Sequence, residues 1–364
     1  MANYQTIYAL SSGSLPSAIA VVRVSGPSTQ KVLKLLVNIV PEPRKMILAE
    51  IKTPEQEVID FSLICFFPKA QSITGEDLAE FHLHGSIAVV EGLCLTLAAI
   101  SDVRPAEAGE FTRRSLNNGK MGLTEVEALS DLIAAETQEQ RKQSLRQLSG
   151  ELSAKYEAWR KKLIRIRAEM EAILDFSDEA DVNQDLESLS LSNDMSLLLK
   201  SIDADILNGI AGEKLRSGIK IVLIGPPNVG KSSLINILLK EDRAIVSPEA
   251  GTTRDTIEAR LNLEGIPVTI FDTAGIRKTE NKIEEEGVKR TEKSAKAADI
   301  IVSIRVPDNK GLDCASYDIE KTTKILKVVN KIDLRTKKDN IYTDELSLSC
   351  KTKDGVDLLL KILG

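Results

Sequence analysis

The sequence lacks the features that would assign it to a membrane, secreted or metal-binding class. It contains no run of about 18 consecutive apolar residues, so we expect no membrane-spanning helix. Residues 1–15 do not combine a charged start with an apolar core, which argues against a secretory signal. The four cysteines form no CxxC pair. We therefore expect reduced thiols in a cytoplasmic protein, with no disulfide framework and no zinc site.

Charge and composition exclude two further classes. The net charge of -6 argues against bulk nucleic-acid binding, although a local basic patch remains open. Hydrophobic residues make up 42% and charged residues 28%, as in ordinary folded proteins, so long disorder is not expected. At about 150 residues per domain, 364 residues predict two or three domains.

The first of three segments, residues 1–121, mixes short apolar runs with turn residues. Strands that alternate with helices predict a compact α/β or α+β domain. The expected strands are 19–24, 58–67 and 78–83, and the expected helices are 28–40 and 89–100.

The second segment, residues 122–217, contains no proline and reads as helical. Thr124 and Glu127 have the spacing of a capping box that opens a helix. Apolar residues recur every three or four positions between Leu145 and Ile173, with an interruption expected at Gly150. A second helix is expected after Ser192-Asn193. These helices predict a bundle. The basic run 160–167 fits either tRNA phosphates or, as the favoured interpretation, a solvated helix face.

The third segment, residues 218–364, repeats short apolar runs separated by helical patterns. This βαβ pattern predicts a doubly wound parallel sheet. The expected strands are 219–224, 268–271, 300–306 and 325–329. One residue breaks the pattern, because Arg305 falls in a run that should be core.

A phosphate-binding motif follows the first of these strands. Residues 225–232 fit G-x-x-x-x-G-K-[ST] and precede an expected helix, 233–239. In this context backbone amides cradle phosphates, Lys231 reaches the β and γ oxygens, and the Ser232 hydroxyl coordinates Mg²⁺. The alternative is a chance match on a glycine-rich turn, which the flanking strand and helix disfavour.

Three further motifs follow in order, each at a strand end. Asp272 opens a D-x-x-G motif that can hold Mg²⁺ through water, and the amide of Gly275 can meet the γ-phosphate. Asn330 opens an N-K-x-D motif, in which the carboxylate of Asp333 can accept hydrogen bonds from guanine N1 and N2. A loop at 349–351 could meet guanine O6. Together the motifs predict a GTP site.

Residues 218–364 thus resemble a Ras-like P-loop GTPase of the translation-factor class. Ile276 stands where a Ras-type enzyme has the glutamine that orients water. Asn228 and the Gly-Thr-Thr-Arg-Asp run 251–255 resemble potassium-activated GTPases. This resemblance implies catalytic roles for Thr253, Gly275 and Glu284, although Glu285 and Glu286 adjoin Glu284 and a solvated helix face is the alternative. The implied metal ligands are Ser232 and Thr253 for Mg²⁺, and Asn228, Ser247, Glu249 and Thr252 for K⁺.

The implied nucleotide contacts come from five loops of this segment. They are Asn228, Val229, Gly230, Lys231, Ser232, Ser233, Thr252, Thr253, Asp272, Thr273, Ala274, Gly275, Asn330, Lys331, Asp333, Ser349, Cys350 and Lys351.

The amino-terminal segment carries motifs at 74–77, 82–85, 109–114 and 118–120. With the order of the segments, these resemble the tRNA modification GTPase family MnmE, also called TrmE. The resemblance implies a homodimer built on an amino-terminal α+β domain that binds a formyl or methylene tetrahydrofolate. It also implies an FAD-dependent partner, MnmG, and modification of C5 of the tRNA wobble uridine. The implied folate residues are Arg23, Glu80 and Lys120.

The resemblance also implies more sequence than this chain has. Family members carry helices after the GTPase segment and a final Cys-x-Gly-Lys motif, and neither occurs before Gly364. We therefore expect an incomplete bundle with an exposed apolar stripe, in which Leu152, Trp159 and Ile166 are not all buried. Two alternatives stay open: an RNA-associated ribosome-assembly GTPase, and a truncated GTP- and folate-binding subunit uncoupled from tRNA modification.

Overall fold

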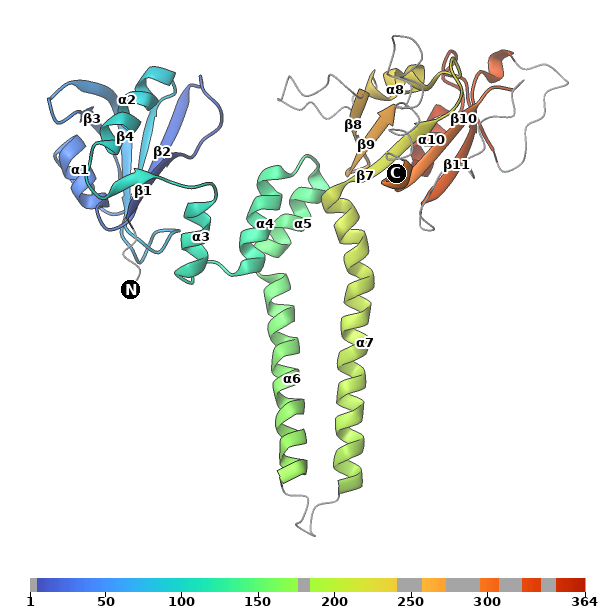
Figure 1. Ribbon diagram of the computed structural model, residues 1–364, viewed down its shortest axis with the longest axis horizontal. Helices are drawn as coiled ribbons and strands as arrows, with labels where there is room; N and C mark the ends of the chain where they lie inside the picture. Colours follow the sequence, from blue (N-terminus) through green and yellow to red (C-terminus); the bar gives the residue numbers. More distant parts are fainter. Residues whose placement is uncertain are drawn as a thin grey trace, which may run out of the picture. The chain divides into compact units, whose positions relative to one another are not determined.

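A computed structural model of the chain divides into two compact units, Met1–Glu127 and Ala128–Gly364 (Figure 1). The expected boundaries at 121/122 and 217/218 remain predictions. Across the part of the chain that is described, no helix has the length and apolar character of a membrane span. The structure describes residues 5–175, 184–240, 257–272, 295–307, 323–334 and 345–363.

The amino-terminal unit is a six-stranded sheet in the order β3-β4-β5-β2-β1-β6, antiparallel except for the parallel pair β1 and β6. Its apolar residues alternate along β2, where Ala20, Val22 and Val24 are buried, so one face forms the core. The helices α1 and α2 pack their apolar sides on this core. The elements are β1 (Thr6–Leu10), β2 (Ile19–Ser25), α1 (Thr29–Val37), β3 (Met46–Lys52), β4 (Val58–Phe67), β5 (Leu78–His84), α2 (Ile87–Ala98), β6 (Val103–Pro105) and α3 (Glu110–Asn117).

A buried polar cluster fastens α3 to this unit. Arg104 pairs with Glu110 through two hydrogen bonds of 2.8 and 2.7 Å, and Arg114 bonds Glu110 at 2.8 Å and Glu76 at 2.9 Å. Thr74 and Ser25 extend the cluster onto β2 through hydroxyls 2.8 Å apart. Because four of these residues belong to the motifs at 74–77 and 109–114, those motifs hold the fold of the unit together.

Four helices follow the amino-terminal sheet. The helix expected to open at Thr124 is present, but it begins at Leu123, so Thr124 lies inside α4 and not before it. A capping box of Thr137 and Gln140 precedes α5. Gly150, with a φ of +88°, separates α5 from α6 as expected. The second long helix continues through Ser192-Asn193, which was wrongly expected to start it. The helices are α4 (Leu123–Ala134), α5 (Gln138–Leu148), α6 (Glu151–Asp175) and α7 (Gln184–Ser217).

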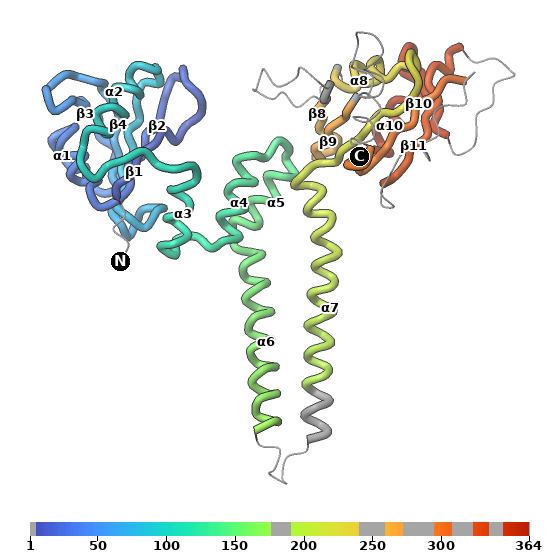
Figure 2. Tube along the Cα trace, in the orientation of Figure 1, coloured from blue at the N-terminus to red at the C-terminus, as the bar shows by residue number. Residues whose placement is uncertain are grey.

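The helices α6 and α7 run side by side (Figure 2). Trp159 donates a hydrogen bond to Ser201 at 3.2 Å, and Ile166 packs in a small cluster with residues of α7. Leu152 and Trp159 are only half-buried, in agreement with the expected apolar stripe. Exposed apolar side chains on these two helices are Tyr156, Leu163, Ile164, Met170, Leu174, Met195, Leu197, Leu199, Ile206, Leu207 and Ile210.

Three arginines of the basic run on α6 pair with glutamates of the same helix. Arg160 pairs with Glu157 at 3.1 Å, and Arg165 pairs with Glu169 at 2.7 Å. The pairs are exposed and follow the i,i+3 and i,i+4 spacing of neighbours on one helix face. This supports the interpretation as a solvated face rather than a phosphate-binding patch.

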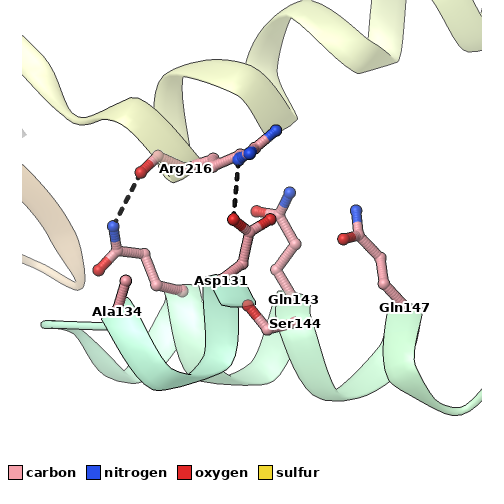
Figure 3. A pocket seen from close by; sticks show the side chains of 7 residues that line it. Asp131, Ala134, Gln143, Ser144, Gln147 and Arg216 are labelled. Atoms are coloured by element: carbon pink, nitrogen blue, oxygen red, sulfur yellow. Dashed lines mark hydrogen bonds and ion pairs between the residues drawn. The ribbon is translucent and has the colours of Figure 1, made fainter. Parts of the chain in front are cut away.

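The carboxyl end of α7 is fastened to α4 and α5 (Figure 3). Arg216 donates from Nε to Asp131 Oδ1 at 2.9 Å, and its carbonyl accepts a hydrogen bond from Gln140 Nε2 at 3.1 Å. Near the same helix end, Lys214 pairs with Asp299 Oδ1. Asp299 Oδ2 accepts a hydrogen bond from the Lys220 backbone amide at 2.9 Å. The chain therefore enters the second sheet from an anchored helix end.

The second sheet has six strands in the order β12-β11-β10-β7-β9-β8, all parallel except the edge hairpin of β8 and β9. In β7, Ile221 and Leu223 pack on one side, and Val222 and Ile224 on the other. Both faces are covered, which explains the continuous apolar run. The elements are β7 (Ile219–Ile224), α8 (Lys231–Lys240), β8 (Ile257–Leu263), β9 (Ile266–Asp272), β10 (Ile300–Arg305), β11 (Lys324–Val329), η2 (Ile332–Leu334), β12 (Leu346–Ser347) and α10 (Val356–Leu363).

We predict that Glu110 makes the amino-terminal unit sensitive to acid. The hydrogen bonds from Arg104 lower the pKa of Glu110 to about 2, against about 4.3 in an unfolded chain. A lowered native pKa adds stability above pH ~4.3 that is lost as the pH falls toward 2, about 3 kcal/mol in all. Hydrogen exchange of the β2 amides should therefore speed up between pH 4 and pH 2.5, after correction for the intrinsic rate.

The substitution Glu110→Gln should speed this exchange at pH 7 and flatten its dependence on pH, because the buried Arg114 and the partly exposed Arg104 both lose their counter-charge. The matched control is Glu107→Gln, whose partner Arg113 is exposed, and it should change little. Equal effects of the two variants would contradict a structural role for the buried cluster.

Candidate nucleotide-binding site

The loop between β7 and α8 has the backbone geometry of a phosphate-binding loop. Asn228 and Gly230 have positive φ angles of 65° and 101°. A Cβ atom on Gly230 would lie 2.3 Å from the Asn330 side-chain nitrogen, and one on Gly225 would lie 2.3 Å from the Ile304 carbonyl oxygen. Both positions therefore require glycine, because neighbouring groups approach the backbone too closely for a side chain.

Lys231, the first residue of α8, extends its side chain into this loop. Its side chain is 5% exposed, and Nζ donates to the carbonyls of Gly225 at 2.5 Å and Pro226 at 2.9 Å. The first helical hydrogen bond of α8 runs from the Leu234 amide to the Gly230 carbonyl, so the amides of residues 231–233 precede it. A lysine ammonium and the first amides of a helix at one loop fit the phosphates of a nucleotide.

The neighbouring hydroxyls suit a metal-bound phosphate. Ser232 and Ser233 are exposed at the start of α8. Asp272 ends β9 in register with Leu223 of β7, so its backbone lies at the same edge of the sheet as the loop. Oxygen donors of this kind are those that Mg²⁺ prefers. The described residues alone contain no group of three or more His, Cys, Asp or Glu placed to hold a metal.

Asn330 connects three loops through one buried amide, 1% exposed. Its Nδ2 donates to the Val229 carbonyl at 2.7 Å, in the phosphate loop. Its Oδ1 accepts from the amides of Lys331 at 2.7 Å and Cys350 at 3.0 Å. The N-K-x-D motif, the phosphate loop and the loop at 349–351 are therefore brought together, as the sequence predicted.

The carboxylate of Asp333 is oriented by a neighbouring serine. Ser349 donates from Oγ to Asp333 Oδ1 at 2.6 Å, while its Oγ accepts the Lys351 amide at 3.2 Å. Asp333 is exposed, so a base can reach its carboxylate. Beside it, burial raises the pKa of the Cys350 thiol. Lys331 reaches back to the Asn228 carbonyl with Nζ at 2.8 Å.

The remaining expected nucleotide and metal residues lie outside the described part of the chain, so their roles stay predictions. They are Ser247, Glu249, Thr252, Thr253, Thr273, Ala274, Gly275 and Glu284.

The expected folate residues lie in the amino-terminal unit. Arg23 of β2 and Glu80 of β5 are direct cross-strand neighbours and form an ion pair of 2.8 Å. Lys120 lies outside the sheet, where its Nζ donates to the Ala70 carbonyl at 2.9 Å. The structure thus brings Arg23 and Glu80 together and holds Lys120 on the loop that precedes β5.

Two buried acids were missed by the sequence analysis. Asp60 accepts hydrogen bonds from Ser62 and from the His84 ring at 2.7 Å, and its pKa is lowered by these and backbone donors despite burial. The sequence signal that could have indicated Asp60 is an acidic residue within an otherwise apolar run. Glu345 pairs with Arg305 across 40 residues, and no local pattern could have indicated it.

A parallel sheet with a phosphate-binding loop and a guanine-type N-K-x-D motif at its carboxyl edge defines a P-loop guanine-nucleotide-binding protein. The family model "GTP-binding protein TrmE N-terminus" matches residues 6–120, and "MnmE helical domain" matches residues 123–364. The chain belongs to the tRNA modification GTPase family MnmE.

Individual relatives agree with this assignment. The chain is 44% identical to the tRNA modification GTPase MnmE of Bradyrhizobium sp. (strain ORS 278), over 99% of this chain and 81% of that protein. It is 46% identical to the protein of the same name in Rhodopseudomonas palustris (strain ATCC BAA-98 / CGA009), over 91% of this chain and 74% of that protein. Among solved structures, the FeoB G-domain from Methanococcus jannaschii matches with 26% identity and a TM-score of 0.30, covering 40% of this chain and 94% of that chain.

We predict that Asp333→Asn changes the base preference from guanine to xanthine. Xanthine carries a carbonyl at C2 where guanine carries an amino group, so an amide donor suits xanthine and a carboxylate suits guanine. The affinity for GDP should fall at least about tenfold and that for xanthosine diphosphate should rise, as measured by calorimetry. The control is Asp354→Asn, an exposed change between the loop at 349–351 and α10. Retained guanine preference in Asp333→Asn would contradict the assignment.

Proposed function

We propose that the chain hydrolyses GTP and takes part in tRNA modification. The observation that carries the proposal is the buried Asn330 amide, which joins the phosphate loop to both guanine loops. The names of the relatives, tRNA modification GTPase MnmE, supply the process. Family membership favours this role over that of an RNA-associated ribosome-assembly GTPase.

In the proposed site, Lys231 and the amides of residues 231–233 bind and orient the phosphates. The Ser232 hydroxyl, Thr253 and, through water, Asp272 would hold Mg²⁺, which neutralises charge on the phosphate oxygens. Asp333 selects guanine. These groups act by positioning and electrostatic stabilisation, because phosphoryl transfer needs little covalent help from the protein.

The water-orienting role is assigned to Glu284, and charge compensation to K⁺. Asn228, Ser247, Glu249 and Thr252 are the proposed K⁺ ligands. Asn228 supports this because it lies in the phosphate loop with a positive φ of 65° and is exposed, so its side chain is accessible. Ile276 stands where a Ras-type glutamine would be and cannot orient water.

We further propose that the chain acts in the cytoplasm as a homodimer with an FAD-dependent MnmG-type partner, at C5 of the tRNA wobble uridine. The amino-terminal sheet supports the dimer, because the face opposite α1 and α2 exposes apolar side chains on neighbouring strands. These are Ile19, Met46, Leu48, Phe61 and Leu63. Arg23 and Glu80 lie on the same face, and with Lys120 they are the proposed residues for a formyl or methylene tetrahydrofolate.

We predict that GTP hydrolysis is faster in K⁺ than in Na⁺ at equal ionic strength, because the larger ion fits the proposed oxygen ligands. The substitution Asn228→Gly removes one ligand oxygen while tolerating the positive φ. It should narrow the K⁺-to-Na⁺ rate ratio toward unity. The measurement is phosphate release under single-turnover conditions in each salt.

The control is Asn208→Ala, which also removes an exposed asparagine side chain, here from α7. Alanine is chosen because glycine would weaken the helix. It should keep the wild-type rate ratio. Equal rates in K⁺ and Na⁺ for the unchanged protein would refute the potassium mechanism while leaving GTP binding intact.

A further inference from the structure

Arg305 is a buried charge at the end of a core strand. It is the last residue of β10, is 6% exposed, and lies in register with Val329 of β11. Its guanidinium forms a two-pronged pair with Glu345, Nε to Oε1 at 2.7 Å and Nη2 to Oε2 at 2.5 Å. The Glu345 side chain is equally buried, at 6%. Because buried ion pairs contribute little more stability than apolar pairs, stability alone does not account for it.

The position of the pair relates it to both guanine loops. The Arg305 carbonyl accepts the Asn330 amide at 2.8 Å, which fixes the start of the N-K-x-D motif. Glu345 directly precedes β12, a strand of only two residues that leads to Ser349. The strand pairing covers only two positions of this segment, and the ion pair adds a side-chain attachment at its start.

Ser349 links the segment that begins at Glu345 to the proposed guanine-binding carboxylate. Its Oγ orients the Asp333 carboxylate at 2.6 Å, and the next residue, Cys350, donates its amide to Asn330 at 3.0 Å. A shift of the segment that begins at Glu345 would misplace both contacts. The phosphate-binding Lys231 belongs to a different loop, where its Nζ donates to the carbonyls of Gly225 and Pro226.

We propose that the Arg305–Glu345 pair is a positioning device that sets selectivity for the guanine base. This inference rests on the proposed assignment of Asn330 and Asp333 to the guanine site. It assigns specificity to two residues outside the four nucleotide motifs, and neither touches the base. Its signature is a loss of discrimination at the 2-amino group of guanine, with phosphate binding preserved.

The test compares the dissociation constants of GDP and inosine diphosphate, which lacks that amino group, for the full chain. The double variant Arg305→Met/Glu345→Leu avoids leaving one buried charge unpaired. We expect the ratio of the inosine diphosphate to the GDP dissociation constant to fall about tenfold, mainly through weaker GDP binding. An unchanged ratio in a folded double variant would overturn the proposal.

A second variant covers the case in which the double variant does not fold. Arg305→Lys keeps the charge but loses the planar two-pronged geometry, so it should give a smaller fall in the same ratio. The control is Arg260→Met/Glu136→Leu, an Arg–Glu pair of 3.0 Å that joins β8, at the opposite edge of the sheet, to the loop between α4 and α5. A fall of the ratio in this control as large as in the test variants would also overturn the proposal.

Asp333→Asn separates failure of the inference from failure of the guanine site. If that variant lowers the ratio and the Arg305 variants do not, the guanine site stands and the positioning role is refuted. If Asp333→Asn leaves the ratio unchanged, the guanine-site assignment fails and the positioning role fails with it. A fall in both sets of variants supports the proposal.

Discussion

One buried amide organises the nucleotide site. The side chain of Asn330 makes three hydrogen bonds to the backbone of three loops, at Val229, Lys331 and Cys350. A buried amide must satisfy its donors and acceptor, so each loop is held where its backbone group can meet Asn330. The same constraint explains Gly230, because any side chain there would collide with the amide nitrogen. The site therefore depends on loops that lie about one hundred residues apart in the sequence.

Polar clusters play the same organising role in the amino-terminal unit. Glu110 and Arg114 came from a motif that resembles the family, and the structure places both in a buried network with Glu76. Their contacts are with the protein itself. A motif shared with a family can thus reflect the fold as well as a ligand. The residues proposed to bind folate, Arg23 and Glu80, are instead partly exposed.

Sequence patterns predicted the features that depend on neighbours along the chain. Apolar runs located β7, β10 and β11, and glycine spacing located the phosphate loop, because strand burial and loop geometry are encoded within a few residues. The edge strand β8 was missed, since an antiparallel edge strand need not be continuously apolar. The start of α7 was misplaced, because Ser192-Asn193 fits a cap as well as a helix interior. The partner of Arg305 was invisible, because no periodicity links residues 40 positions apart.

The Arg23–Glu80 pair shows how the proposed dimer and the proposed folate site would depend on each other. At present the side chains are 35% and 17% exposed, so water still solvates the pair. A second copy covering the exposed apolar face would remove part of that water and raise the cost of keeping both charges. A folate has a carboxylate tail for a cation and pterin donors for a carboxylate, so it could supply the hydrogen bonds that the water gave up. Dimer formation on this face would then strengthen folate binding, and folate binding would strengthen the dimer by the same free energy.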